Sequence, residues 1–329
     1  MKNYFNITSG FNNVEYISKI KSAGATELYT GFFDQDTNKK WPIAFNILNR
    51  RGEDANFSDW KKFAGAVKEA EKFNLPVYVT FNGLYTEQQH KIILDTVNKV
   101  SRLDGVRGII VNDIALLLIL REKKYSKDIV ISTGGTTFNA DTVRFYKSLG
   151  AKRIILDRQL SVRDIIKIIS ADNTLQYEVF AFGGSCFFID GFCSFFHCSE
   201  NLDYGKKIVH THNVNQFSTG CHLIESNIKK YCAEYNSKYK KFGADGRNFL
   251  DNMRHSCNLC SLYDLRKFKN ISLKIVNRKN STVSFVEAVK LAADKLETAK
   301  NKNEYVKYCK KMLAERKILT CKETQCYYK

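Results

Sequence analysis

Short runs of β-branched and aromatic residues alternate, over the first 182 residues, with segments whose apolar positions recur at helical spacing. In VEYISKIKSA, for example, Ile17, Ile20 and Ala23 fall on one face of a helix. Alternating strands and helices are typical of βαβ units and a parallel sheet. The predicted strands cover residues 3–7, 26–32, 76–82, 105–113, 128–133, 151–157, 176–182 and, after a long interruption, 272–277.

Eight strand–helix units predict an α/β fold of the (β/α)8, TIM-like type, with catalytic groups at the C-terminal ends of the strands. The alternative is an open, doubly wound parallel sheet. The sequence has neither a GxGxxG motif after the first strand nor a Walker A loop, so nucleotide-binding versions of the open sheet lose support. Two helix starts are also predicted, with Ser58 and Ser161 as the N-caps.

A cysteine-rich insertion, residues 183–270, separates the last two predicted strands. We expect residues 1–300 to form one barrel domain that includes this insertion, and residues 301–329 to form a basic C-terminal helix and tail. The insertion holds seven of the ten cysteines and five of the six histidines. In a barrel it would lie over the C-terminal mouth, where functional sites are built.

The N-terminus lacks a basic region followed by an apolar run, and no apolar stretch reaches the ~18 residues of a membrane helix. We therefore expect a cytoplasmic protein with no membrane span. Because the cytosol keeps thiols reduced, ten cysteines indicate metal or redox chemistry, or small buried side chains, rather than a disulfide framework.

Two pairs of cysteines in the insertion have spacings that suit a metal site. Cys186 and Cys193 form a C-x6-C pair, and Cys257 and Cys260 form a C-x2-C pair, which lets two thiolates face one metal. Soft thiolates favour zinc or an iron–sulfur cluster, and spacing alone does not separate the two. The histidines of the insertion keep a Cys/His zinc site open. Three cysteines near the C-terminus are interpreted as surface or incidental thiols: Cys309, Cys321 and Cys326.

The charge of the chain is strongly positive and unevenly spread. The formal net charge is +18, and residues 201–329 hold 26 Lys or Arg against 12 Asp or Glu. An excess of this size favours RNA or another polyanion as a partner. The alternative is that the lysines only solvate helix faces.

Several segments, in order, resemble the peptidase U32 family. EVFAFGGSCFFIDGFC is similar to the family's strand ending H-G-x-L-C followed by x6-C, with Cys186 and Cys193 in register. VRFYKSLGAKRIILDRQLS is similar to the family's ARFLKELGVERVVLARELS. GATELYTG resembles GADAVYVG, LPVYVTFN resembles the family's helix-plus-VYVTxN pattern, and SLKIVNR resembles SLKIEGR. The resemblance extends to about residue 297.

The resemblance implies function as well as fold. The family name implies a peptidase, sometimes called collagenase-like. Better-understood members are anaerobic, oxygen-independent hydroxylation proteins that act on a quinone precursor, ribosomal RNA or a transfer RNA wobble uridine. Several carry a [4Fe–4S] cluster on four cysteines. Carried over by position, the resemblance implies Cys186, Cys193, Cys221 and one of Cys257 or Cys260 as ligands, with Cys260 fitting the spacing slightly better; zinc is the alternative metal.

The chain also departs from the family pattern. Gln159 and Val276 stand where the family has glutamates, and Gly134 stands where it has a glutamine. If those lost groups bind substrate, the chain takes a different substrate or acts as one half of a pair. A second U32-type subunit is therefore an expected partner, because the quinone-pathway members work in pairs.

Polar residues at strand ends complete the predicted site. Lys274 and Arg278 are candidates for binding an anionic group. Asp157 and Arg158 are expected to pair with each other or to bind substrate, and structural salt bridges are the alternative for all four. Asp190 is a candidate ligand or base, or a turn former. Further strand-end candidates are Asn82, Asn112, Asp113, Thr133 and Asn139.

The leading hypothesis is therefore an iron–sulfur protein of U32 type that carries out oxygen-independent hydroxylation, with RNA favoured as substrate by the basic C-terminal half. One alternative is a small molecule such as a quinone precursor, hydroxylated by a pair of subunits. A second is a peptidase, although the sequence has no H-E-x-x-H or G-x-S-x-G motif. A third is a non-catalytic subunit that carries a cluster.

Overall fold

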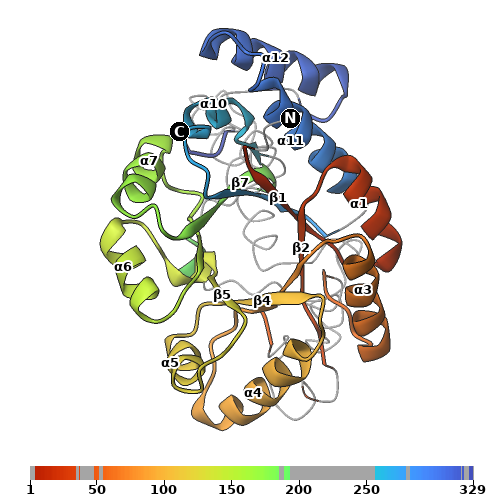
Figure 1. The fold of residues 1–329 in the computed structure, drawn as a ribbon, viewed down its shortest axis with the longest axis vertical. Coiled ribbons are helices and arrows are strands. Elements are labelled where there is room, and N and C mark those ends of the chain that lie inside the picture. Colours follow the sequence, from red (N-terminus) through yellow and green to blue (C-terminus); the bar gives the residue numbers. More distant parts are fainter. Residues whose placement is uncertain are drawn as a thin grey trace, which may run out of the picture.

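The structure, a computed structural model, describes residues 4–34, 37, 48–51, 55–184, 189–192, 256–278, 282–319, 321 and 326–328. Eight parallel strands form a closed ring in the order β1-β2-β3-β4-β5-β6-β7-β9, which confirms the predicted barrel and excludes the open sheet (Figure 1). The strands are β1 (Asn6–Gly10), β2 (Glu27–Thr30), β3 (Val77–Phe81), β4 (Val106–Val111), β5 (Asp128–Ile131), β6 (Arg153–Ile155), β7 (Gln176–Gly183) and β9 (Ile271–Val276).

Helices surround the ring of strands on its outside (Figure 1). Among the described residues, no helix combines the length and the apolar character that crossing a membrane requires. The helices of more than one turn are α1 (Ile17–Ala23), α3 (Trp60–Lys72), α4 (Glu87–Ser101), α5 (Ile114–Glu122), α6 (Ala140–Ser148), α7 (Val162–Ala171), α11 (Thr282–Lys295) and α12 (Lys302–Glu315).

The helix starts test the N-cap predictions. Ser161 caps α7 in a capping box with Asp164, as predicted. The prediction of Ser58 for α3 was wrong, because Asp59 accepts the Lys62 N–H at 2.7 Å and is the cap. Helix α5 was not predicted at all. Its sequence, IALLLILRE, is apolar on nearly every side, so it has no polar stripe from which a helical period can be read.

Inside the barrel, charged side chains of alternating sign form a buried chain. Arg153 on β6 pairs with Glu27 on β2 through two hydrogen bonds of 2.6 and 2.9 Å, and with Glu178 on β7 at 3.2 Å. Glu178 in turn pairs with Lys274 on β9. A buried charge requires such partners, because removal from water is costly. The chain of pairs therefore holds four strands in register.

Two elements lie outside the predicted set of eight strands. Strand β8 (Ser256–Cys257) runs antiparallel to the end of β7. The chain then continues through the short helix α10 (Leu262–Leu265) into β9. After α12, the C-terminal residues return to the barrel, where Cys326 bridges Cys257 and the Tyr327 N–H donates to the Cys257 carbonyl at 3.1 Å.

Candidate functional site

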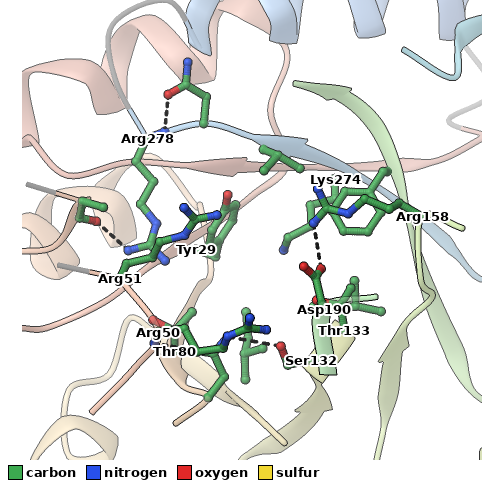
Figure 2. A pocket seen from close by; sticks show the side chains of 17 residues that line it. Tyr29, Arg50, Arg51, Thr80, Ser132, Thr133, Arg158, Asp190, Lys274 and Arg278 are labelled. Atoms are coloured by element: carbon green, nitrogen blue, oxygen red, sulfur yellow. Dashed lines mark hydrogen bonds and ion pairs between the residues drawn. The ribbon is translucent and has the colours of Figure 1, made fainter. Parts of the chain in front are cut away.

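A cavity of about 290 Å³ opens at the C-terminal ends of the barrel strands (Figure 2). Parallel barrels build their sites at this end, because all the strands deliver their C-terminal side chains and loops to it. The cavity is lined by Tyr29, Arg50, Arg51, Ala55, Thr80, Asn82, Ile110, Ser132, Thr133, Ile155, Arg158, Phe180, Asp190, Lys274, Val276, Asn277 and Arg278.

The lining of this cavity is strongly cationic. Five of the lining residues are Arg or Lys, and Asp190 is the one carboxylate among them. Walls of low dielectric strengthen the field of such charges and concentrate anions at the opening. The arrangement therefore suits a ligand with at least one anionic group.

Arg158 and Asp190 form an ion pair across the cavity (Figure 2). The Arg158 Nη2 lies 2.8 Å from Asp190 Oδ2, and its Nη1 donates to the Gly184 carbonyl at 3.1 Å. Its guanidinium also lies over the Phe180 ring, 4.5 Å from the centroid. Burial by itself would raise the pKa of Asp190, but the charge of Arg158 and a hydrogen bond from Thr133 outweigh it, so the pKa is lowered.

Lys274 lies at the floor of the cavity, at the upper end of the buried chain of charges. Its ammonium pairs with Glu178 and lies 3.9 Å from the centroid of the Tyr29 ring. Burial would raise the pKa of Glu178, but the charges of Lys274 and Arg153 outweigh it and lower the pKa. Lys274 is thus both a cavity residue and a member of the structural network.

Arg278 and Arg51 form the opposite wall. The Arg278 Nη1 donates to the Ala55 carbonyl and, at 2.8 Å, to Asn56 Oδ1, and its guanidinium lies 5.2 Å from the Tyr29 centroid. Burial lowers the pKa of Arg51, with the neighbouring charge of Arg158 acting in the same direction. An arginine so far above neutral pH stays charged, so this wall keeps its cationic character.

Asp157 lies beside the cavity rather than in its lining. Its side chain is fully buried, Oδ1 accepts the Gln159 N–H at 2.9 Å, and Oδ2 has no hydrogen-bond partner among the described residues. Burial raises the pKa of Asp157, and the nearby charge of Asp190 adds to the rise. The carboxyl therefore supports the loop that follows β6 and carries Arg158, rather than contacting the cavity directly.

The other strand-end candidates divide into two groups. Asn82 and Thr133 line the cavity, and the Asn82 amide donates to Ser132 Oγ at 3.2 Å. Asp113 and Asn139 instead cap helices α5 and α6. The remaining candidate, Asn112, is buried against Gly134 and outside the lining.

Comparison with known proteins decides the family. The family model described as Peptidase family U32 matches residues 12–328. The chain belongs to this family. The predicted resemblance is thereby confirmed, and it extends beyond residue 297 to the C-terminal tail.

Curated relatives of this U32 chain are named tRNA hydroxylation protein P. The Helicobacter pylori protein is 30% identical over 149 residues, which cover 45% of this chain and 34% of the relative. The Haemophilus influenzae protein is 33% identical over 127 residues, which cover 39% of this chain and 27% of the relative. The chain thus matches about a third of the length of these relatives. A solved structure titled as the U32 peptidase Mk0906 is 11% identical, with a TM-score of 0.42 over 56% of this chain and 71% of that one.

The cysteines predicted as ligands fall in two places. Cys186, Cys193 and Cys221 lie outside the described residues. The described residues that precede the first two, Gly184 and Asp190, lie at the cavity, because Gly184 accepts a hydrogen bond from Arg158 and Asp190 lines the wall. The predicted ligand role of these cysteines stays a prediction.

Cys257 and Cys260 are described, and both lie near other thiols. Cys257 is buried, and burial raises its pKa. A hydrogen bond with Cys309 lowers the pKa of Cys260 to about 7. Cys309, interpreted from the sequence as a surface or incidental thiol, is in fact fully buried in α12.

Sequence reasoning missed three main parts of the cationic cavity. Tyr29 at the end of β2 and the adjacent Arg50 and Arg51 were not selected. The two consecutive arginines in the segment NRRGED, between the second and third predicted strands, were the available signal. A βα loop of a barrel opens at the C-terminal mouth, so charged residues in such a loop are site candidates.

Proposed function

We propose that this U32 chain takes part in the oxygen-independent hydroxylation of a tRNA base. The proposal is carried by one combination: a U32 match over residues 12–328 and, at the mouth of the barrel, a small cavity lined by five cations. The names of the curated relatives point to tRNA as the substrate. The basic C-terminal part of the chain suits the same polyanion.

The cavity volume favours one extruded nucleotide over a folded RNA segment. At about 290 Å³ it lies at the lower end of the range for small-ligand pockets. Enzymes that act on a base remove it from its stack and hold it in a pocket of this kind. In this proposal Arg50, Arg51 and Arg278 bind phosphate or another anionic group, since a guanidinium offers a planar fork of donors.

Polar groups on the other side of the cavity would read the base edge. Asn82, Ser132 and Thr133 offer donors and acceptors in one cluster. The guanidinium of Arg158, which already stacks on Phe180, offers a flat surface on which a base can lie. Val276 lines the cavity where the family resemblance places a glutamate, so the wall lacks a carboxylate that would repel an anion.

Cys186, Cys193, Cys221 and a fourth cysteine would hold a [4Fe–4S] cluster, for which thiolates are the usual donors. The cluster, when bound, would supply the redox chemistry of the hydroxylation. This chain's own residues would bind and orient the nucleotide: the Arg158–Asp190 pair fixes one wall, and Lys274 stays charged beside Glu178. Zinc is the alternative metal for the same thiols.

The test is tRNA nucleoside mass spectrometry in a bacterium that lacks its own tRNA hydroxylation proteins. Expression of the wild-type chain should restore nucleosides that carry one added oxygen, and Cys193→Ser and Arg50→Ala should abolish or strongly reduce them. Arg107→Ala is the matched control, because Arg107 is an exposed arginine at the N-terminal end of β4, far along the strand from the cavity. Restoration that persists in Cys193→Ser would refute the cluster, and no restoration by any partner combination would refute the tRNA substrate.

Binding separates RNA from the alternatives. The affinity of the purified chain for tRNA should fall steeply with salt, and Arg278→Ala should lower the salt slope by about 1 if that side chain contacts a phosphate. An affinity unaffected by salt would argue for a small-molecule substrate. Cleavage of a peptide substrate that survives Cys193→Ser would instead support the peptidase alternative.

A further inference from the structure

Five cysteines from separate parts of the sequence gather between the barrel wall and α12. Around Cys257, the thiols of Cys326, Cys260 and Cys321 lie close enough to act on it electrostatically. Cys309 reaches the same group from α12 and is hydrogen-bonded with Cys260. No disulfide joins these five described cysteines. A gathering of reduced thiols from four segments is more than the packing of small apolar side chains requires.

This group lies on the outer face of the barrel wall, away from the cavity. Cys257 pairs with Phe182 across the β7–β8 ladder, and paired residues share a face of the sheet. The Phe182 ring stacks on Phe285 of α11, with 4.6 Å between centroids, so this face points outward to the helices. Phe180 and Lys274, by contrast, line the cavity on the inner face. Cys257 is therefore directed away from the mouth of the barrel.

The C-terminal tail is held in register with the C-x2-C pair. Cys326 bridges Cys257 in a parallel pairing, which directs both side chains to the same face. The Tyr327 N–H donates to the Cys257 carbonyl at 3.1 Å, and Tyr305 Oη donates to the Leu259 carbonyl at 3.0 Å, which fixes α12 against the turn between the two thiols. Cys321 and Cys326 form a second pair, with C-x4-C spacing. Both spacings are those of structural zinc sites.

We propose that these two pairs form a structural Zn²⁺ site, separate from the cavity and from the cluster cysteines, with four thiolate ligands: Cys257, Cys260, Cys321 and Cys326. Among the described residues, no three His, Cys, Asp or Glu side chains already surround one point as metal ligands do. Zinc binding therefore draws the four thiols inward from positions that are near one another but not yet convergent.

The surroundings suit this ion. Four thiolates around Zn²⁺ carry a net charge of about −2, which needs compensation in a partly buried site. Lys302 and Lys310 of α12 lie close enough to act on Cys260 electrostatically and supply that positive charge. Cys309 stands behind Cys260 as a hydrogen-bond partner, the kind of outer contact that orients metal ligands.

The site joins the C-terminal tail to the wall of the cavity. Next to Cys326, Tyr327 Oη donates to the Gly184 carbonyl at 2.8 Å, and Tyr328 Oη accepts the Phe180 N–H at 2.8 Å. Phe180 lines the cavity, and Gly184 also accepts from Arg158. Zinc that anchors residues 321 and 326 would thus stabilise the wall on which Arg158 stacks.

The proposal also changes the expected cluster ligands. If Cys257 and Cys260 bind zinc, the fourth ligand of a [4Fe–4S] cluster comes from the other cysteines of the insertion, Cys198 or Cys232. This consequence rests on the proposed function; the zinc site itself does not.

Metal analysis of the full chain, purified without oxygen, tests the proposal. We expect about one zinc per chain in addition to any iron. Cys321→Ser and Cys326→Ser should each lose most of the zinc and keep the iron, whereas Cys186→Ser and Cys193→Ser should keep the zinc. Cys309→Ala is the matched control, a neighbouring thiol outside the ligand set, and should also keep it. Loss of zinc in Cys309→Ala with retention in Cys321→Ser would overturn the ligand set.

A second measurement uses the wild-type chain, so that misfolding of a variant cannot mimic the result. Alkylation followed by peptide mass spectrometry should find Cys257, Cys260, Cys321 and Cys326 protected, and all four should become reactive together when a chelator removes one zinc. Reactivity of these four that does not change with chelator, or a Cys260–Cys309 disulfide in a chain without zinc, would overturn the proposal. Failure of tRNA hydroxylation with zinc present would count against the proposed function alone.

Discussion

The carboxylate of Asp190 lies 2.8 Å from the guanidinium of Arg158, and this pair joins two loops at the mouth of the barrel. Arg158 follows β6, and Asp190 belongs to the segment after β7. Both side chains are largely buried, so the pair is little screened by solvent. The pair therefore fixes the wall of the cavity as well as contributing charge to it.

Asp190→Asn should destabilise the chain and reduce any activity of the cavity, because it leaves Arg158 without its carboxylate. Breaking a buried pair typically costs roughly 3–5 kcal/mol. The pKa of Asp190 is lowered in the fold, so its contribution is present above about pH 4 and is lost as pH falls below that value. Urea unfolding at several pH values measures this. Asp141→Asn, which removes an exposed pair with Arg144 on α6, should cost about 1 kcal/mol or less; an equal cost for both would contradict the prediction.

Asp157 is expected to act by position, and two substitutions separate that role from catalysis. Asp157→Ala leaves the Gln159 N–H without its acceptor and should cost about 1–3 kcal/mol. Asp157→Asn keeps an oxygen acceptor and should retain most of the stability and the activity. Because the pKa of Asp157 is raised in the fold, wild-type stability should fall as pH rises from about 4 to the folded-state pKa, and this fall should vanish in Asp157→Asn. An inactive but stable Asp157→Asn would support the catalytic interpretation instead.

Glu178→Gln should be strongly destabilising, since it removes the carboxylate shared by Lys274 and Arg153 inside the barrel. We expect a loss of roughly 3–5 kcal/mol in the free energy of unfolding. The pKa of Glu178 is lowered, so the contribution of this pair should disappear as pH falls below about 4. Glu69→Gln, which removes an exposed pair with Lys72 on α3, is the control and should change stability by at most about 1 kcal/mol. Similar values for the two variants would show that the buried chain of charges contributes little.

The two C-terminal tyrosines should differ in their effect on stability. Tyr328→Phe leaves the buried Phe180 N–H without its acceptor and should cost about 1–3 kcal/mol. Tyr327→Phe removes a donor to the Gly184 carbonyl, which still accepts from Arg158, so it should cost about 1 kcal/mol. Thermal unfolding of both variants measures the difference. A larger loss for Tyr327→Phe would mean that its ring contact with Phe180 was disturbed as well.

Much of the fold and part of the site could be predicted from local signals. All eight barrel strands were placed, because buried parallel strands are continuous runs of β-branched and aromatic residues. Of the four predicted catalytic residues, Arg158, Lys274 and Arg278 line the cavity, since polar residues at strand ends meet at one mouth. Asp157 follows the same strand as Arg158 but lies behind the wall, because successive residues after a strand turn in different directions.

The remaining parts depend on contacts between distant segments. Glu27, Arg153, Glu178 and Lys274 come from four strands, and no local pattern shows that they meet. Arg50 and Arg51 enter the cavity only because the loop after β2 opens at its edge. The two-residue strand β8 is too short to leave a period in the sequence.

The sequence by itself determined the barrel and the U32 family, because strand composition, helical period and motif order are properties of consecutive residues. Only the tertiary structure decided which charges share the cavity and that Cys257 and Cys260 lie with Cys309, Cys321 and Cys326 on the outer wall. The physical reason is that closing the ring brings β7 beside β9 and leads the tail back to β8, which joins residues that are far apart in the chain.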